Sequence, residues 1–426
     1  MGQAPSSPLT RLAGCLLLGL LLLNGFRIDW RHVSEGGSVD LRNRITGARL
    51  MSAGIDPFRY KWKPGEPAEY CDPYNNPAVA ISKTTITPTF LLLKLPFAQF
   101  PYTVSPLMWL LCQWLFLLGT GLLWLRACPN EREKWIWACL FVGFTYTVSW
   151  RLHADRGQGY VLPTFLIAAW ISSLRKPSAH SAKLAGFWVA LLISIRPHYI
   201  VLFAPLFAWR YRDQILPAIV GLGICGLVPM MLDASCWADY QSGMSEWSHV
   251  YRNGINPRPP PTPFPAMIEG VPIDQLGRFA VIPFADSSVF ALFRSFGWSG
   301  MPETPPLLVF VLLSALTFGL MRNKSEESQL LALVAWSFAA DFFLPALRNC
   351  YNDVLILNVM ALALIGGKTT RIISIILLIS VPLGWWVLGS MPRERWLINL
   401  PTLMMLAASA LCLFPHSTSR VWKSNP

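Results

Sequence analysis

The sequence predicts an all-α polytopic membrane protein, and three observations support this fold class. Hydrophobic residues make up 53% of the chain and charged residues only 14%, whereas charged residues make up about a quarter of a typical soluble domain. The hydrophobic residues gather in long runs of helical length. The 19 Trp and 35 Pro residues also fit a bilayer, where aromatic side chains lie at the interfaces and helix breakers are tolerated.

The net charge of +12 fits a membrane protein, because loop Lys and Arg residues set its orientation and contact anionic lipids. We therefore expect membrane lipids as partners and no nucleic acid. The nine Cys residues form no Cys-x-x-Cys pair and no metal-ligand spacing. A disulfide among Cys71, Cys236 and Cys350 stays an open alternative, since all three are expected in outer loops.

We expect about 11–12 transmembrane segments in a single membrane domain that covers the whole chain. The apolar runs place them at residues 12–26, 104–125, 135–148, 160–174, 184–195, 199–209, 215–232, 306–321, 330–347, 354–366, 372–389 and 396–414. The first run is expected to be a retained span, because the sequence LLNGFRIDW offers no small-x-small cleavage site.

Two of these runs, 184–195 and 199–209, are too short to cross a bilayer, which needs about twenty residues. They are joined by RPHY and form either a broken hairpin or one kinked span. With the hairpin and a cytoplasmic N-terminus, the cytoplasmic segments carry 15 Lys and Arg residues and the short outer loops carry 6. This distribution follows the positive-inside rule and favours the hairpin.

The hairpin topology places two large loops outside the cytoplasm, at residues 27–102 and 233–305. The first contains two amphipathic stretches, SVDLRNRITGARLMS and TPTFLLLKLPFAQF. The second contains NPRPPPTPFP, a polyproline II run that suits a stiff spacer better than a recognition peptide.

The first of these amphipathic stretches is predicted to be a helix. Ser38 is expected to cap its start, and Gly54 to end it in the left-handed conformation. A narrow apolar face, expected to lie on the membrane surface, consists of Leu41, Ile45, Ala48 and Met51 or Ser52. Asp40 and Arg44 lie on another face, and their spacing alone would make them an exposed ion pair worth about 0.3–0.5 kcal/mol.

The same stretch contains an Asp, a small residue eight positions later, a Leu, and then Gly-x-x-Pro-aromatic. This pattern resembles the first outer loop of GT-C type glycosyltransferases. More narrowly, it is similar to glycosyltransferase family 87, whose members are mannosyltransferase-like and depend on polyprenyl-phosphate sugars. The matching residues are Asp40, Leu41, Ala48, Leu50, Gly54, Pro57 and Phe58.

A second part of the resemblance runs from GQGYVLPTF through a basic turn and an LAG helix to SIRPHY. The matching residues there are Gly157, Gln158, Arg196 and Pro197. The chain departs from the family pattern at two positions. Tyr160 replaces the usual Asn, and Asn352, in LRNCYND, stands near the place of a His that precedes an aromatic residue. We expect Arg348 and Asn352 to take over from that His.

The resemblance implies an inverting transfer of a hexose, with mannose expected, from a polyprenyl phosphate to a lipid-linked or cell-envelope glycan. The reaction would take place on the outer face of a bacterial inner membrane. Inversion needs one general base, which contributes about 10²–10⁴-fold in rate, and Asp40 is the expected base. Arg196 is expected to bind the phosphate leaving group. The other expected substrate contacts are Arg44, Gln158, His198, Arg348 and Asn352.

Other interpretations stay open. Asp72, in EYCDPYNNP, is a rival base, although an Asp-Pro turn would also explain it. Arg196 could instead extend to the outer interface without binding substrate. The chain has no Asp-x-Asp pair, so we expect transfer without a metal or another cofactor. The alternative functions are a transporter or flippase of lipid-linked saccharides, a glycan polymerase, and a non-catalytic membrane scaffold.

Overall fold

A computed structural model of the protein describes residues 8–73, 75, 79–175, 178–252, 267–269, 271–272, 286, 288–298, 300–346 and 348–365. In this part of the chain, the regular structure is helical apart from one antiparallel pair of short strands, β1 (Met267–Ile268) and β2 (Val271–Pro272). The predicted all-α class is confirmed.

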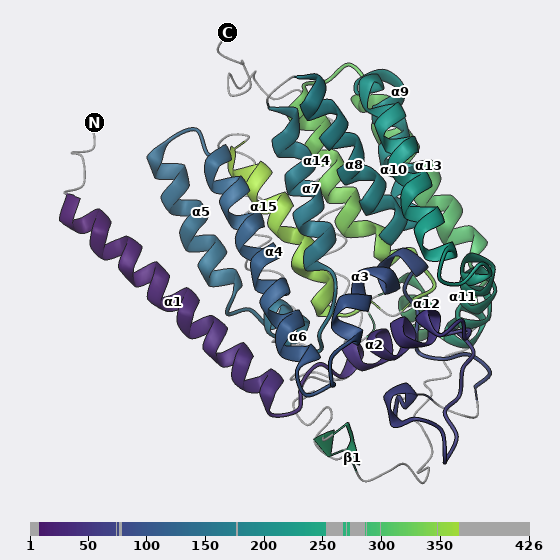
Figure 1. The fold of residues 1–426 in the computed structure, drawn as a ribbon. Coiled ribbons are helices and arrows are strands. Elements are labelled where there is room, and N and C mark those ends of the chain that lie inside the picture. Colours follow the sequence, from purple (N-terminus) through teal and green to yellow (C-terminus); the bar gives the residue numbers. More distant parts are fainter. Residues whose placement is uncertain are drawn as a thin grey trace.

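Ten of the described helices correspond to the first ten predicted segments and form a bundle (Figure 1). They are α1 (Pro8–Ser34), α4 (Ser105–Ala127), α5 (Glu131–Phe144), α7 (Val161–Leu174), α8 (Ala179–Ile195), α9 (Ile200–Trp209), α10 (Ile215–Met230), α13 (Thr304–Met321), α14 (Glu326–Ala339) and α15 (Ile356–Ile365). The predicted segments 372–389 and 396–414 lie outside the described residues.

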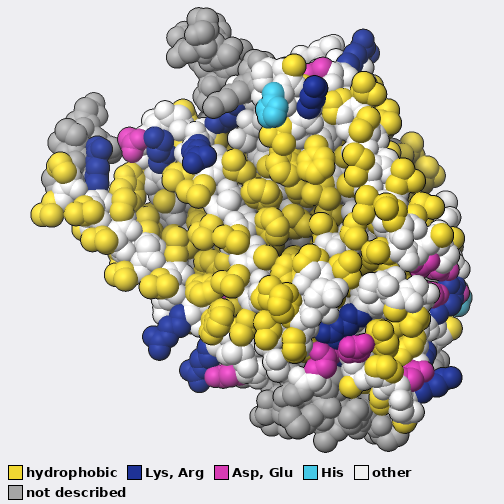
Figure 2. Space-filling view, in the orientation of Figure 1, with side chains coloured by type: hydrophobic (Ala, Val, Ile, Leu, Met, Phe, Trp, Pro, Cys, Tyr) yellow, Lys and Arg dark blue, Asp and Glu magenta, His cyan; other side chains and the backbone are white. Residues whose placement is uncertain are grey.

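Four of the described helices are long and apolar enough to cross a membrane. They are α1, α4, α13, and α10 together with the preceding turn η3 (Arg212–Gln214). Figure 2 shows hydrophobic side chains over the middle of one face of the bundle and charged side chains gathered toward its two ends. This distribution is typical of an integral membrane protein whose middle lies in lipid.

Short elements gather at one end of the bundle, the lower end in Figure 1, which we call the outer end. The helices and strands there are α2 (Val39–Ser52), α3 (Pro88–Ala98), α6 (Val148–Asp155), α11 (Cys236–Arg252), α12 (Val289–Ser295), β1 and β2. Four 3-10 turns belong with them: η1 (Ala68–Tyr70), η2 (Pro197–Tyr199), η5 (Ala340–Phe342) and η6 (Cys350–Leu355). Residues from both predicted outer loops therefore lie at this end.

The RPHY segment reverses the chain. After α8 ends at Ile195, η2 follows and α9 begins at Ile200. The carbonyl of Gln214 lies only 2.8 Å from where a Cβ on Gly186, in the first half of α8, would be. The chain has therefore returned along α8, as the hairpin alternative predicts. Pro197 explains the break, because it lacks a backbone donor and restricts the residue before it.

Two predicted spans end earlier than expected. The segment predicted at 135–148 ends with α5 at Phe144, and the segment predicted at 330–347 ends with α14 at Ala339. After α14 the chain runs through η5 and an irregular stretch to η6. This stretch contains Asp341 and Arg348, whose burial requires charged or polar protein partners rather than lipid.

The predicted membrane-surface face of α2 is wrong. Leu41, Ile45 and Ala48 are fully buried against residues of α3 and α4, so α2 lies on the protein. The fold-back of α3 over α2 removes this face from both water and lipid, which buries it more completely than a membrane surface would.

The start of α2 also differs from the prediction. Ser38 has a left-handed backbone, with a φ of 69°, and its side chain caps no helical N–H. The backbone N–H groups of Ser38 and Asp40 donate instead to the carbonyls of Asp155 and Arg156. Gly54 follows the end of α2 with a φ of 67°, as predicted.

The outer end of α1 is fixed by Asp29, which is almost fully buried. Its carboxylate accepts hydrogen bonds from the indoles of Trp114 and Trp150, at 3.0 and 2.9 Å, and from Arg151 at 2.5 Å. These bonds tie α1 to α4 and α6, and so fix the point from which α2 departs.

Candidate active site

Asp40, in the first turn of α2, lies in a polar cluster at the outer end. Its carboxylate accepts two hydrogen bonds from Arg156, at 2.6 and 2.7 Å, and one from the side-chain amide of Gln158. In place of the ion pair with Asp40 that spacing alone suggested, Arg44 donates to the carbonyl of Gly157 at 2.8 Å and to Oε1 of Gln158 at 2.5 Å. Gln158 therefore links Asp40 to Arg44.

The loop that carries Gln158 is held in one conformation. Gly157 has a φ of 65°, which glycine adopts without strain, and a Cβ there would lie 2.7 Å from the Cβ of Leu41. Trp109 donates to the carbonyls of Gly157 and Gln158 at 3.1 and 3.2 Å, and Gln113 donates to that of Gln158 at 2.7 Å. These two side chains of α4 thus fix the backbone of Gly157 and Gln158, next to Asp40.

The cations around Asp40 keep it ionised. Burial would raise the pKa of Asp40, but Arg156, Arg44 and Lys83 outweigh burial and hold that pKa below the ordinary value for aspartate. Within the part of the chain that the structure describes, no arginine makes a bidentate bond with the neighbouring Asp155, and burial raises the pKa of Asp155 to about 6. Two adjacent carboxyl groups therefore differ in acidity because only one of them is clamped by Arg156.

A second charged cluster is centred on Asp341, in η5. One carboxylate oxygen lies 3.3 Å from Nη1 of Arg196 and 3.5 Å from Nε2 of His198. The other oxygen accepts a hydrogen bond from the side-chain amide of Asn352 at 2.9 Å. The cluster joins the turn between α8 and α9 to the irregular chain after α14.

Two tyrosines connect the two clusters. The guanidinium of Arg196 lies 4.1 Å from the ring centre of Tyr160, and the rings of Tyr160 and Tyr351 lie 5.9 Å apart. Burial and then the charge of Asp40 raise the pKa of Tyr351, so Tyr351 lies near Asp40. The Asp40 and Asp341 clusters therefore belong to one site.

Tyr160 and Asn352, the two residues that depart from the family pattern, contact the two partners of one ion pair, Arg196 and Asp341. Tyr160 lies under Arg196, and Asn352 donates to Asp341. Asn352 is buried, and its side-chain oxygen accepts a hydrogen bond from the backbone N–H of Asn349 at the start of η6. Its side chain therefore faces Asp341 and other protein groups and not solvent.

Arg348 is placed differently from the expected substrate contact. Its side chain is only 2% exposed, donates to Asp353 at 2.9 Å and stacks on Phe338. A guanidinium engaged in this way stabilises the chain between η5 and η6. The structure places Arg348 against Asp353 and Phe338, and its contact with the donor stays a prediction.

His198 lies beside Asp341 with part of its side chain exposed. Burial lowers the pKa of His198 to about 4, with Asp341 opposing that shift. The imidazole is therefore neutral at physiological pH, and it can donate one hydrogen bond and accept another.

The rival base Asp72 is buried at the edge of the same site. Burial lowers the pKa of Lys83, and the charges of Asp72 and Asp40 oppose this shift, which shows that Lys83 lies near both carboxylates. Cys71, Cys236 and Cys350 are free thiols, so the alternative of a disulfide among them is wrong.

The expected set of site residues omitted Asp341 and Arg156. Asp341 has a recognisable signal in the sequence, since a carboxylate inside an apolar run is functional by default. Arg156 has a weaker signal, because a basic residue in a short outer loop can contact phosphate or sugar hydroxyls but can also be solvated. Only the structure shows that Arg156 clamps Asp40.

The two predicted outer loops contact each other at α2. Glu269, between β1 and β2, accepts hydrogen bonds from Arg42 at 2.6 Å and Arg49 at 2.5 Å, and from the backbone of Tyr102 at 2.9 Å. Arg42 is completely buried and donates further to the carbonyl of Cys71. The second loop is thus tied to α2, the helix that carries Asp40.

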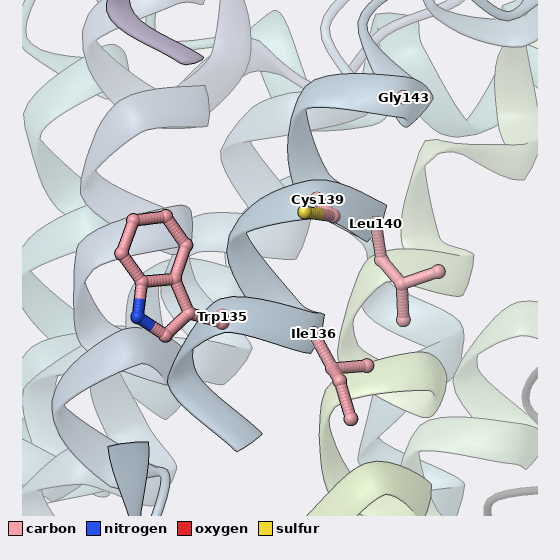
Figure 3. A pocket seen from close by; sticks show the side chains of 5 residues that line it. All are labelled: Trp135, Ile136, Cys139, Leu140 and Gly143. Atoms are coloured by element: carbon pink, nitrogen blue, oxygen red, sulfur yellow. The ribbon is translucent and has the colours of Figure 1, made fainter. Parts of the chain in front are cut away.

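An apolar crevice lies away from these charges, on α5. It is lined by Trp135, Ile136, Cys139, Leu140 and Gly143 (Figure 3). In the described part of the chain, no carboxylate, His, Lys or Arg side chain lines it. Among the described residues, no group of three or more His, Cys, Asp or Glu side chains could hold a metal ion.

The family model for glycosyltransferase family 87 matches residues 85–263. The matched part includes Arg156, Gln158 and Arg196, whereas Asp40 and Asp341 lie outside it. No curated protein and no solved structure matches the chain. The match confirms the predicted resemblance to family 87.

Proposed function

We propose that this membrane glycosyltransferase moves a hexose, with mannose expected, from a polyprenyl-phosphate donor to a lipid-linked or cell-envelope glycan. The coarser activity, that of a membrane glycosyltransferase, is supported by the family 87 match and by the apolar helices. The sugar, the donor, the acceptor, inversion, the outer-face location and the bacterial inner membrane are part of the proposal.

The observation that carries the proposal is the cluster of cations at the site. Four cations, Arg44, Lys83, Arg156 and Arg196, surround Asp40 and Asp341, the two carboxylates that they contact or shift. A phosphate that bridges a lipid and a sugar carries the opposite charge, and arginines bind phosphate oxygens well.

Among these arginines, Arg196 has the most capacity to bind a new ligand. A guanidinium has five N–H donors, and among the described residues Arg196 bonds Asp341 and Tyr160 alone. Its side chain is 21% exposed. In contrast, Arg156 gives both its Nε and an Nη to Asp40. We therefore assign the leaving phosphate to Arg196.

In the proposed reaction, Asp40 takes the proton from an acceptor hydroxyl. The acceptor oxygen then forms a bond to the anomeric carbon while the bond from that carbon to the phosphate oxygen breaks. Polyprenyl phosphate leaves with the bonding electrons, and its charge is held by Arg196. One carboxylate is sufficient for this single displacement.

The low pKa of Asp40 makes it a weak base while Arg156 clamps it. A donor phosphate bound at Arg196 would bring a negative charge into the site, which would raise the pKa of Asp40 and strengthen it as a base. Gln158 would keep the carboxylate oriented during this exchange, because it bonds both Asp40 and Arg44. His198 is proposed to bond a sugar hydroxyl, and Asn352 to act through Asp341.

The test uses purified protein in lipid with radiolabelled polyprenyl-phosphate mannose and total lipid extract from the source cells. Asp40→Asn is compared with Asp155→Asn, which changes a neighbouring carboxyl group that makes no bidentate bond. We expect the wild type and Asp155→Asn to form a new labelled lipid and Asp40→Asn to lose at least about 100-fold in rate.

Equal transfer by all three proteins would remove Asp40 from the mechanism and make Asp72 the next carboxylate to test. No transfer by the wild type despite bound donor would favour another sugar or a transport function.

A further inference from the structure

Asp341 is a buried carboxylate that the proposed reaction does not use. It is only 4% exposed, although it lies at the end of α14, where the chain leaves the helical bundle. One of its oxygens faces Arg196 and the other accepts from Asn352, so both oxygens already have a partner among the described residues.

Arg196 is held on two sides by described residues, and its side chain remains 21% exposed. Asp341 contacts Nη1, and the ring of Tyr160 supports the flat face of the guanidinium at 4.1 Å. A free arginine side chain samples many rotamers, and these two contacts select one of them. Because a guanidinium has five N–H donors, this arrangement leaves some of them for a ligand.

We propose that Asp341 is a positioning residue that holds Arg196 in the conformation that binds the donor phosphate. This inference rests on the proposed function, because it names the residue that positions Arg196 for the donor phosphate.

Asn352 completes the arrangement. It donates to the far oxygen of Asp341 at 2.9 Å, and it is itself fixed through its bond with the backbone of Asn349. The Asp341 carboxylate is therefore held in place by Asn352, and it contacts Arg196 in the turn after α8. A buried carboxylate also supplies the counter-charge that Arg196 needs before the donor arrives.

Asp341→Asn keeps the shape of the side chain and removes its charge. We expect the KM for the polyprenyl-phosphate donor to rise about tenfold or more, because one charge-assisted contact to Arg196 is lost. The kcat at saturating donor and the KM for the acceptor should stay within about twofold of wild type.

Asp353→Asn is the matched control. Like Asp341, Asp353 is buried and pairs with an arginine. Its partner, however, is Arg348, which lies in the chain between η5 and η6. Loss of the Asp353 carboxylate should change stability and leave the donor KM near the wild-type value. An equal rise in donor KM in both variants would overturn the inference, because it would show a general effect of loosening this chain.

The decisive experiment combines Asp341→Asn with Arg196→Gln. If Asp341 acts through Arg196, the double variant has the donor KM of Arg196→Gln alone. Additive effects would refute a positioning role, and a fall in kcat with an unchanged donor KM would assign Asp341 to the chemical step. If Asp341→Asn does not fold, Asp341→Glu serves in its place and should raise the donor KM by a smaller factor.

Binding of a fluorescent polyprenyl phosphate without sugar separates this inference from the proposed function. If the wild type binds it and Asp341→Asn binds it equally well, only the positioning role is wrong. If the wild type shows neither binding nor transfer, the donor assignment itself is wrong, and the role of Asp341 falls with it.

Discussion

Replacing Arg156 with Gln is expected to make catalysis sensitive to mild acid. Arg156 holds the Asp40 carboxylate through two bonds of 2.6 and 2.7 Å. Unit charges about 4 Å apart interact by about 4 kcal/mol at an effective dielectric constant of about 20. Without this interaction, Arg44, Lys83 and the hydrogen bond from Gln158 still oppose burial, but the pKa of Asp40 rises. Asp155 shows the direction of this effect, since burial raises its pKa to about 6 although Arg156 opposes the shift.

The assay is the pH dependence of kcat/KM for the donor, which reports the ionisation of the free enzyme. We expect Arg156→Gln to lose activity, relative to its own value at about pH 7.5, as the pH falls toward about 5, because Asp40 must be ionised to act as a base. The wild type and Arg156→Lys, which keeps the positive charge, should lack this acidic limb. Parallel profiles for Arg156→Gln and the wild type would refute the clamp as the cause of the low pKa.

Two further predictions concern Glu269 and Gly157, which hold the helix and the loop of the site in place. Glu269→Gln should lower the free energy of unfolding by about 3 kcal/mol, because it leaves the buried Arg42 without its carboxylate. Burial raises the pKa of Glu269, but Arg49 and Arg42 outweigh burial and lower it below 4.5, so this contribution is complete at neutral pH and is lost as the pH falls through the folded-state pKa. Thermal unfolding in detergent at pH 7 measures the effect, and an unchanged midpoint would contradict it. Gly157→Ala should cost about 1–3 kcal/mol, because it combines a left-handed φ of 65° with crowding against Leu41. Gly143→Ala, where a Cβ meets nothing within 4 Å, is the control for the same measurement and should remain close to wild type.

The membrane fold could be predicted because its signal is local. A run of apolar residues identifies a helix without any knowledge of its neighbours, and the first ten predicted segments correspond to helices. The ends of those helices were less predictable. The segment after Ala339 continues to look apolar, and only the partners of Asp341 and Arg348 explain why it leaves the helix.

The site could be predicted only in part, because its contacts join distant parts of the chain. The resemblance drew attention to Asp40, Gln158 and Arg196, and the structure places all three in one region. It could not show that Arg156 would clamp Asp40, since the two residues are 116 positions apart and the sequence carries no trace of that contact. The apolar face of α2 was assigned to the membrane for the same reason, as α3 was not known to cover it.

The wide separation of these contacts has a consequence for biosynthesis. Arg196 meets Asp341 across 145 positions, and Asp40 meets Arg156 across 116. During translation, the segment with Asp40 emerges long before either partner. A nascent chain that stops before η5 lacks Asp341, the carboxylate partner of Arg196, and also Asn352, which anchors Asp341. Full affinity for the donor therefore requires that nearly every described helix has been inserted, and a truncated chain left in the membrane would bind the donor weakly.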